Sequence, residues 1–334
     1  MKFGAVPTDD AAGSILAHSI RMTGAKRMPK GTHLTSGHIR ELTQAGHDRV
    51  VVARLDADDV EENIAARQLA EAIAPQAERL GLRVSAAGAG RVNLYAAQAG
   101  VTLIDAAAIH ALNAVHPMIT IATVAPFHRA DADSMIATIK IIAYGVPQTA
   151  LTRAQGAAVN AISVAPPRYK TATLIETQVG PDHPSSKGRD ALSGRLHRMG
   201  MTLTDRCVVA HTQTPLADAI KHASGDVIFV LTASATSDPM DVGPQALRES
   251  GGDVTGFGMP VDPGNLLFFG SLGDKPVIGL PGCARSPALN GADWVLERLI
   301  CGLTLTQADI SRMGVGGLLK EIPTRPQPRS TRVT

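Results

Sequence analysis

The chain has 334 residues, of which 44% are hydrophobic, so we expect two or three folded units rather than one. Its net charge of +2 and its lack of a basic stripe interleaved with aromatic residues argue against a nucleic-acid-binding protein. The three cysteines have no metal-binding spacing, and no apolar run is long enough for a signal peptide or a membrane span. We therefore expect a cytoplasmic protein with no membrane partner.

Residues 1–56 are predicted to form an N-terminal mixed α/β unit. The segment GTHLTSGHIRELTQAG is typical of a helix, with Thr35 near its N-cap and Gly46 just past its end. The segment DRVVVARL that follows is predicted to be a strand.

Residues 57–166 are predicted to form a second α/β unit. VEENIAARQLAEAIA has helical spacing and ends before Pro75, while ITIATV and MIATIKIIAYGV are rich in β-branched residues and predict strands. Gly88 and Gly90 begin a dinucleotide-binding pattern, but Asn93 occupies the place of its third glycine. A tight turn is the favoured interpretation of that segment.

Residues 167–320 show regular strand–helix alternation, and 321–334 form a Pro/Arg-rich tail. We expect one helix to have Thr214 as N-cap and Pro215 in its first turn, and the last helix to run from about Pro287 to Cys301. Such alternation predicts an α/β fold with a mostly parallel sheet in a three-layer αβα arrangement.

Three loops are expected to meet at the carboxyl edge of this sheet, where ligands bind in such folds. The first, Thr177–Gly188, mixes hydroxyls, glycines, a lysine and an acid. The second, Thr232–Asp241, carries five hydroxyls and two carboxylates. The third is the turn Pro281–Pro287.

The third loop suggests an anion site. Gly282 allows a ligand close to the backbone, and Ser286 followed by Pro287 is typical of a helix start, whose N–H groups favour phosphate. Arg285 adds a fork of donors beside it. The alternative is a plain strand-to-helix turn, but three polar loops at one edge favour a ligand site.

The second loop offers a site for Mg²⁺, because Asp238 and Asp241 are hard oxygen ligands and Mg²⁺ takes one or two carboxylates plus ligand phosphates. The alternative is that both acids cap turns or the next helix. Ser234 lacks the Gly-x-Ser-x-Gly pattern of a serine hydrolase. For Cys283, packing is favoured over a nucleophilic role.

The C-terminal half resembles the molybdopterin-binding domain of molybdenum-cofactor biosynthesis proteins, in particular molybdopterin molybdotransferases. The resemblance is strongest in DPGNLLFFGSLGDKPVIGLPGCARS. The family pattern there is kept at Pro263, Gly264, Gly270, Gly279, Leu280, Pro281, Gly282 and Ser286. The resemblance covers residues 170–300 well and 1–56 fairly, including VPTDDAAGSILAHSI, but 60–165 poorly.

Several family positions differ in this chain. Asn265 replaces a lysine, and Cys283-Ala284 replaces Asn-Pro. In the loop after the central strand, threonines 232 and 236 replace serines, Ser234 and Asp238 replace glycines, and Asp241 matches the final acid. Thr177 matches the first loop, whose acidic pair is missing.

The resemblance implies binding of molybdopterin or its nucleotide form and insertion of molybdate with help from Mg²⁺. It implies a catalytic and metal-binding role for Asp241, with Asp238 as a second metal ligand. The implied pterin-binding residues are Thr177, Thr232, Ser234, Thr236, Pro263, Gly264, Asn265, Pro281, Gly282, Arg285 and Ser286. Some divergent members are joined to a molybdopterin nucleotidyltransferase, an expected partner here, and members are commonly homodimers.

Three functions therefore stay open at this point. The chain is a molybdotransferase-type biosynthesis protein, a non-catalytic carrier or sensor of molybdopterin, or an unrelated α/β enzyme acting on a phosphorylated metabolite. The missing acidic pair and glycines favour the carrier.

Overall fold

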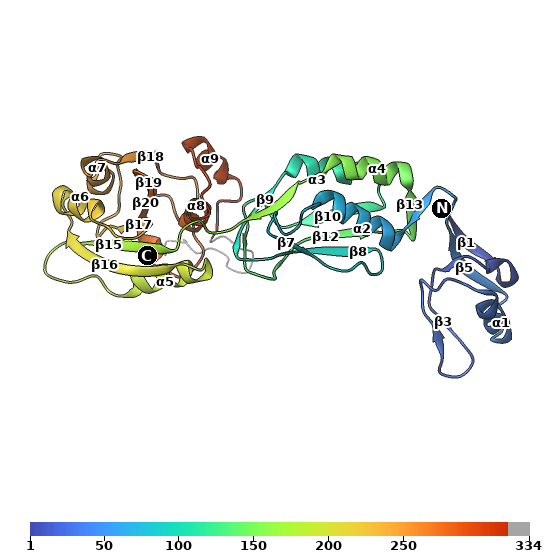
Figure 1. Cartoon of the computed structure of the whole chain (residues 1–334). Helices are drawn as coiled ribbons and strands as arrows, with labels where there is room; N and C mark the ends of the chain where they lie inside the picture. The colour runs from blue at the N-terminus through green and yellow to red at the C-terminus, as the bar shows by residue number, and fades with distance from the viewer. Residues whose placement is uncertain (320–334) are drawn as a thin grey trace, which may run out of the picture. The chain divides into compact units, whose positions relative to one another are not determined.

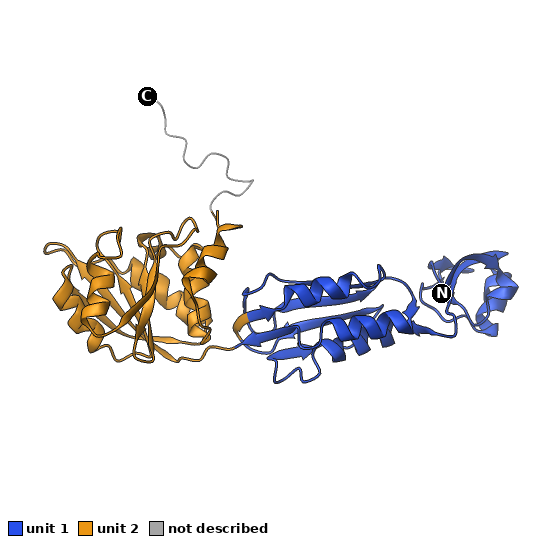
Figure 2. Cartoon of the chain, turned by 90° about the horizontal axis from the view of Figure 1, so that it is seen from above, with its two compact units in different colours: residues 1–98, 102–165 blue, residues 99–101, 166–334 orange. Residues whose placement is uncertain are grey.

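The computed structural model describes residues 1–319, so the predicted tail at 321–334 lies outside the described residues. The chain divides into two compact units: residues 1–98 with 102–165, and residues 99–101 with the chain from Pro166 onward (Figure 2). The finer division, with boundaries after residues 56, 166 and 320, stays a prediction. Within the described part, no helix has both the length and the apolarity that a bilayer crossing requires.

The first segment of the chain forms a small antiparallel sheet in the order β1–β5–β2, a β3–β4 hairpin and one α-helix. The predicted helix is confirmed, because Thr35 caps α1 and the side chain of His38 completes a capping box. The elements are β1 (Lys2–Pro7), η1 (Thr8–Ala11), β2 (Ile15–Leu16), β3 (Ile20–Arg21), β4 (Arg27–Met28), α1 (Ser36–Gln44) and β5 (Arg49–Arg54).

The next segment contains a four-stranded antiparallel sheet, in the order β10–β12–β8–β7, whose core includes residues from three helices. The elements are β6 (Asp59–Glu61), α2 (Glu62–Ile73), β7 (Leu82–Val84), β8 (Arg91–Ala96), β9 (Gly100–Ile104), α3 (Ala106–Asn113), β10 (Ile119–Thr123), β11 (Arg129–Ala130), β12 (Met135–Ile141), β13 (Gly145–Pro147), α4 (Gln148–Ala157) and β14 (Ile162–Ala165). Gly90, with φ at +68°, turns directly into strand β8, which confirms the tight turn.

Residues 166–319 contain a six-stranded sheet in the order β16–β15–β17–β20–β19–β18. β16, β15, β17 and β20 pair in parallel, and β19 runs antiparallel to both of its neighbours. The elements are β15 (Thr171–Gln178), α5 (Lys187–Arg198), β16 (Thr202–Ala210), α6 (Gln213–Lys221), β17 (Val227–Leu231), α7 (Val242–Glu249), β18 (Asp253–Phe257), β19 (Phe268–Leu272), β20 (Lys275–Leu280), η2 (Gly282–Arg285), α8 (Gly291–Ile300), α9 (Gln307–Ser311) and η3 (Arg312–Gly314).

This sheet is the middle layer of the predicted three-layer arrangement (Figure 1). All five residues of the central strand β17 are buried, as a strand covered on both faces requires. Helices α6 and α7 pack together on one face, while α5 contacts η2 and is bonded to α8 on the other. After β15 the chain adds β16 on one side of it and then β17 on the other side, so the strand order reverses at β15.

Two predicted helix starts are wrong. The helix expected at Thr214 begins at Gln213 with Thr212 as N-cap, so Pro215 stays within its first turn. The last helix begins at Gly291 rather than Pro287, because Asn290 and Asp293 form a reciprocal capping box. Residues 286–290 instead form irregular chain after η2, and the Ser286 and Ala288 carbonyls accept hydrogen bonds from Arg195.

The antiparallel pair β18–β19 generates a first prediction. A methyl group at Gly270 would overlap the backbone carbonyl oxygen of Asp253 on the paired strand. We therefore expect Gly270→Ala to destabilise the second unit by about 3 kcal/mol, the upper range for overpacking a core. Urea unfolding followed by fluorescence of Trp294, the single tryptophan, reports on this unit.

The matched control is Gly194→Ala, in the exposed middle of α5, where an added methyl group has nothing within 4 Å. It should stabilise the protein by up to about 1 kcal/mol, because alanine is the better helix former. Equal midpoints for the two variants would show that β18 does not pack against β19 as described.

Candidate functional site

The three loops at the carboxyl edge are bonded to one another. Thr177 Oγ1, at the end of β15, accepts a hydrogen bond from the Ala233 backbone N–H at 2.7 Å. His211 Nδ1 lies 2.9 Å from the same hydroxyl. Arg285 Nη2 donates to the Thr232 carbonyl at 2.9 Å. The loops that follow β15, β17 and β20 therefore form one connected structure beside the reversal of strand order.

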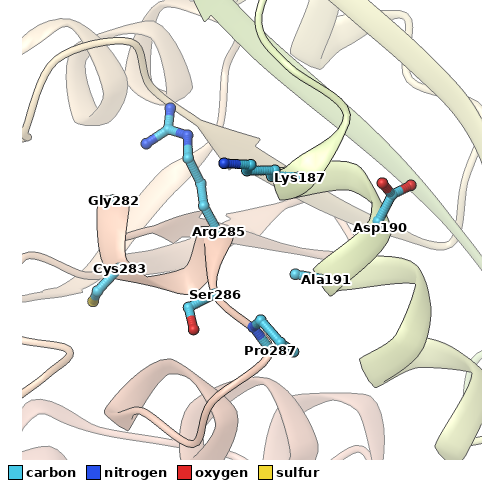
Figure 3. A pocket seen from close by; sticks show the side chains of 8 residues that line it. All are labelled: Lys187, Asp190, Ala191, Gly282, Cys283, Arg285, Ser286 and Pro287. Atoms are coloured by element: carbon cyan, nitrogen blue, oxygen red, sulfur yellow. The ribbon is translucent and has the colours of Figure 1, made fainter.

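A cavity of about 640 Å³ opens between the start of α5 and the η2 turn. That volume falls within the range of small-molecule sites, roughly 300–1,000 Å³. Its lining residues come from α5, from η2 and from the two residues that follow η2 (Figure 3): Lys187, Asp190, Ala191, Gly282, Cys283, Arg285, Ser286 and Pro287.

Two cations dominate the charge of the cavity. Lys187 extends from α5 towards Arg285, whereas the Asp190 carboxylate points away from Arg285 (Figure 3). The Arg285 guanidinium is held by its bond to Thr232, with Nη1 only 3.4 Å from the position a Cβ on Gly282 would take. Among residues 1–319, no carboxylate lies within 4 Å of either cation's charged nitrogens. The cavity therefore presents positive charge that an anion can neutralise.

The predicted helix-start anion site is wrong. The N-cap of α8 is Asn290, which is 1% exposed, and its backbone N–H is taken by the Asp293 carboxylate at 2.8 Å. The next N–H, of Gly291, donates to the Pro263 carbonyl. Ser286 caps no helix, and its hydroxyl accepts from the Ala288 N–H at 3.2 Å. An anion in the cavity therefore depends on side-chain cations rather than on the dipole of α8.

The loop after β17 uses its polar groups internally. Thr232 Oγ1 donates to the Ser234 carbonyl at 2.7 Å and lies 3.3 Å from Thr236 Oγ1. Both threonines are buried. None of the three lines the cavity, so their predicted contact with a pterin finds no support in the cavity's lining.

Asp241 and Asp238 serve as caps. Asp241 Oδ1 accepts from the Val242 N–H at 2.7 Å and its Oδ2 from Ser237 at 3.0 Å, while Asp238 Oδ1 accepts from Met240 at 2.8 Å. In the described part of the chain, no three His, Cys, Asp or Glu residues gather as a metal site. A magnesium ion at this loop would therefore take most of its ligands from phosphate and water.

Pro263, Gly264 and Asn265 do not line the cavity, and the first two contact the start of α8. A Cβ on Gly264, whose φ is +144°, would lie 2.7 Å from the Gly291 nitrogen. Asn265 Nδ2 donates to the Met259 carbonyl at 3.3 Å. Pro281 is the N-cap of η2 and is buried. Of the predicted binding residues, Gly282, Arg285 and Ser286 line the cavity.

Lys187 lies in the first loop expected at the carboxyl edge, but it was not predicted as a binding residue, and neither were Asp190 and Ala191, which follow it in α5. Glu176, which is 1% exposed in β15, was not predicted to matter either. Glu176 Oε2 pairs with Arg206 at 2.5 Å, while Oε1 has no hydrogen-bond partner among the described residues. A glutamate within the apolar run TATLIET, with an arginine on the neighbouring predicted strand, was the signal for this buried pair.

The N-terminal segment matches a family model described as a domain of unknown function, DUF8806, over residues 5–54. A search of curated proteins finds no match to the chain.

The chain resembles several solved structures, but with low sequence identities and low TM-scores. The molybdopterin biosynthesis MoeA protein from Pyrococcus horikosii is 14% identical with a TM-score of 0.32, covering 90% of this chain and 75% of its own. A molybdenum cofactor biosynthesis protein from Pyrococcus furiosus is 10% identical with a TM-score of 0.23, covering 93% and 65%. The CinA protein from Thermoplasma acidophilum is 16% identical with a TM-score of 0.25, covering 35% and 91%. At these scores the likeness assigns no residue of this chain.

Cysteine reactivity tests the placement of the cavity wall. Burial raises the pKa of the Cys301 thiol to about 12, so this cysteine carries almost no reactive thiolate. Cys283 is half-buried and lines the cavity. We expect iodoacetamide to label Cys283 in the native protein and to spare Cys301, as read by peptide mass spectrometry. Preferential labelling of Cys301 would contradict the described burial.

Asp241 tests the capping role. Asp241→Ala should destabilise the second unit by about 1 kcal/mol, the usual value for losing a helix N-cap. Asp241→Asn keeps one acceptor for the cap and should cost less than the alanine variant. Urea unfolding followed by Trp294 fluorescence measures both. Identical losses in the two variants would show that the charge, rather than the cap, is what the residue supplies.

Proposed function

We propose that the second unit binds a small phosphate-bearing molecule of the molybdopterin class in the cavity between α5 and η2. The observation that carries this proposal is the pair of cations, Lys187 and Arg285, that face the cavity without a carboxylate partner among residues 1–319. A phosphate would accept charge-assisted hydrogen bonds from both, and the planar fork of Arg285 suits two phosphate oxygens.

The identity of the ligand rests on the residues that build the wall. Gly282 and Ser286, at two of the positions that keep the molybdopterin-binding pattern, line the cavity together with Arg285. Asp190 also lines the cavity, with its carboxylate directed away from Arg285 (Figure 3). A carboxylate accepts hydrogen bonds from the amino and ring N–H groups of a pterin, so a ligand with its anionic end at the two cations and its ring towards Asp190 fits the charges of the lining.

Binding and carriage are favoured over molybdate insertion. Both carboxylate oxygens of Asp241 accept backbone N–H groups, and the residue is absent from the cavity's lining. The proposal therefore assigns no chemical step to it. Insertion of molybdate is the second candidate, and product formed from molybdate and Mg²⁺ on bound molybdopterin would favour it.

The direct experiment is a titration of the purified chain with molybdopterin, prepared anaerobically from a molybdoenzyme and followed by pterin fluorescence. We expect saturable binding, with inorganic phosphate as a weak competitor. Binding should weaken as salt rises, because Lys187 is exposed and its charge is screened. Absence of saturable binding would overturn the proposal.

Substitution of the two cations gives the sharper prediction. Arg285→Met and Lys187→Met should each weaken molybdopterin binding by about tenfold or more, the effect of one lost charge-assisted hydrogen bond. The control is Lys221→Met, an exposed lysine at the carboxyl end of α6. It removes the same charge and should leave the affinity unchanged. Equal weakening by all three would show only a general charge effect.

A further inference from the structure

We infer that Arg195 is a positioning residue that fixes the η2 side of the cavity to its α5 side and so controls ligand affinity without lining the cavity. The inference rests on the proposed function of that cavity. Arg195 lies on α5 one helical turn after Ala191, which lines the cavity, and it is 4% exposed.

The guanidinium of Arg195 holds the backbone of the opposite wall. Nη1 donates to the Ala284 carbonyl at 3.0 Å. Nη2 donates to the Ser286 carbonyl at 2.9 Å and to the Ala288 carbonyl at 3.1 Å. Three alternate carbonyls of one loop therefore converge on one buried side chain.

The same arginine is tied to the start of α8. Its Nε pairs with Asp293 Oδ1, and the other oxygen of that carboxylate accepts the Asn290 N–H at 2.8 Å. Asp293 is 3% exposed, so its charge needs this partner. One side chain, Arg195, is therefore bonded both to the capping box of α8 and to the loop that precedes it.

A lysine at this position would keep the charge but lose the fork. Its single ammonium cannot reproduce four donors fixed in one plane, so the pair with Asp293 can persist while the loop carbonyls lose their partners. The backbone that carries Arg285 and Ser286 would then sample other conformations. A ligand would have to order this loop on binding, and its affinity would fall.

The test compares Arg195→Lys with Ile220→Val in the full chain. Ile220 is fully buried in α6 on the opposite face of the sheet, so its variant lowers stability without touching either cavity wall. The two readouts are the rate of Cys283 alkylation in the ligand-free protein and the affinity for molybdopterin. Trp294 unfolding midpoints measure the loss of stability in each variant.

In Arg195→Lys, we expect iodoacetamide to alkylate Cys283 several-fold faster than in the unsubstituted chain. We also expect this variant to bind molybdopterin about tenfold more weakly. Ile220→Val should leave both values at those of the unsubstituted chain. Unchanged alkylation and affinity in Arg195→Lys would overturn the inference, as would the same change in both variants. If Arg195→Lys does not fold, Arg195→Met with Asp293→Asn removes both charges and is judged by the same two readouts.

The readouts separate this inference from the proposed function. If the unsubstituted chain does not bind molybdopterin, the proposed function fails, and the alkylation rates still decide whether Arg195 holds the loop. If the chain binds molybdopterin but neither readout responds to Arg195→Lys, only the inference fails.

Discussion

The candidate site depends on the reversal of strand order beside β15. Because β16 and β17 lie on opposite sides of β15, the helices α5 and α6 leave to opposite faces of the sheet. The chain therefore continues from β15 and from β17 to opposite faces at the carboxyl edge, where ligands of open α/β sheets bind. The contact between Thr177 and Ala233 and the bond from Arg285 to Thr232 hold the loops that follow these strands in place. The side chains that line the cavity between α5 and η2, above all Lys187 and Arg285, then determine which ligand it can bind.

Arg195 on α5 and Arg285 on η2 show how burial separates a charge that shapes the site from one that can bind a ligand. Arg195 is buried, and a carboxylate and three carbonyls occupy its donors, so it contributes to the shape of the site. Arg285 reaches the cavity with one carbonyl bond and no carboxylate within ion-pair distance in the described residues. The desolvation cost of a buried charge explains why the first is paired, and access to water explains why the second need not be.

Much of the architecture follows from local patterns in the sequence. Alternating strands and helices predicted the three-layer α/β arrangement, and the Thr35 cap of α1 was correctly identified from neighbouring residues. The start of α8 was placed four residues too early, because Ser286–Pro287 is a good local cap and the competing bonds of Arg195 come from a helix about ninety residues away in sequence. The same limit explains why Lys187 was not predicted as a binding residue, because only the folded sheet brings α5 beside η2. Gly282, Arg285 and Ser286 were predicted as binding residues from a glycine that admits a ligand, an arginine fork and an expected helix start, together with the family resemblance.

A phosphate-bearing pterin is proposed to bind between α5 and η2 through Lys187 and Arg285, which have no carboxylate partner among residues 1–319. The most direct measurement is a crystal structure of the chain with bound molybdopterin. We expect density for the phosphate within hydrogen-bond distance of both the Lys187 ammonium and the Arg285 guanidinium. A ligand bound elsewhere on the molecule, with this cavity empty, would contradict the proposal.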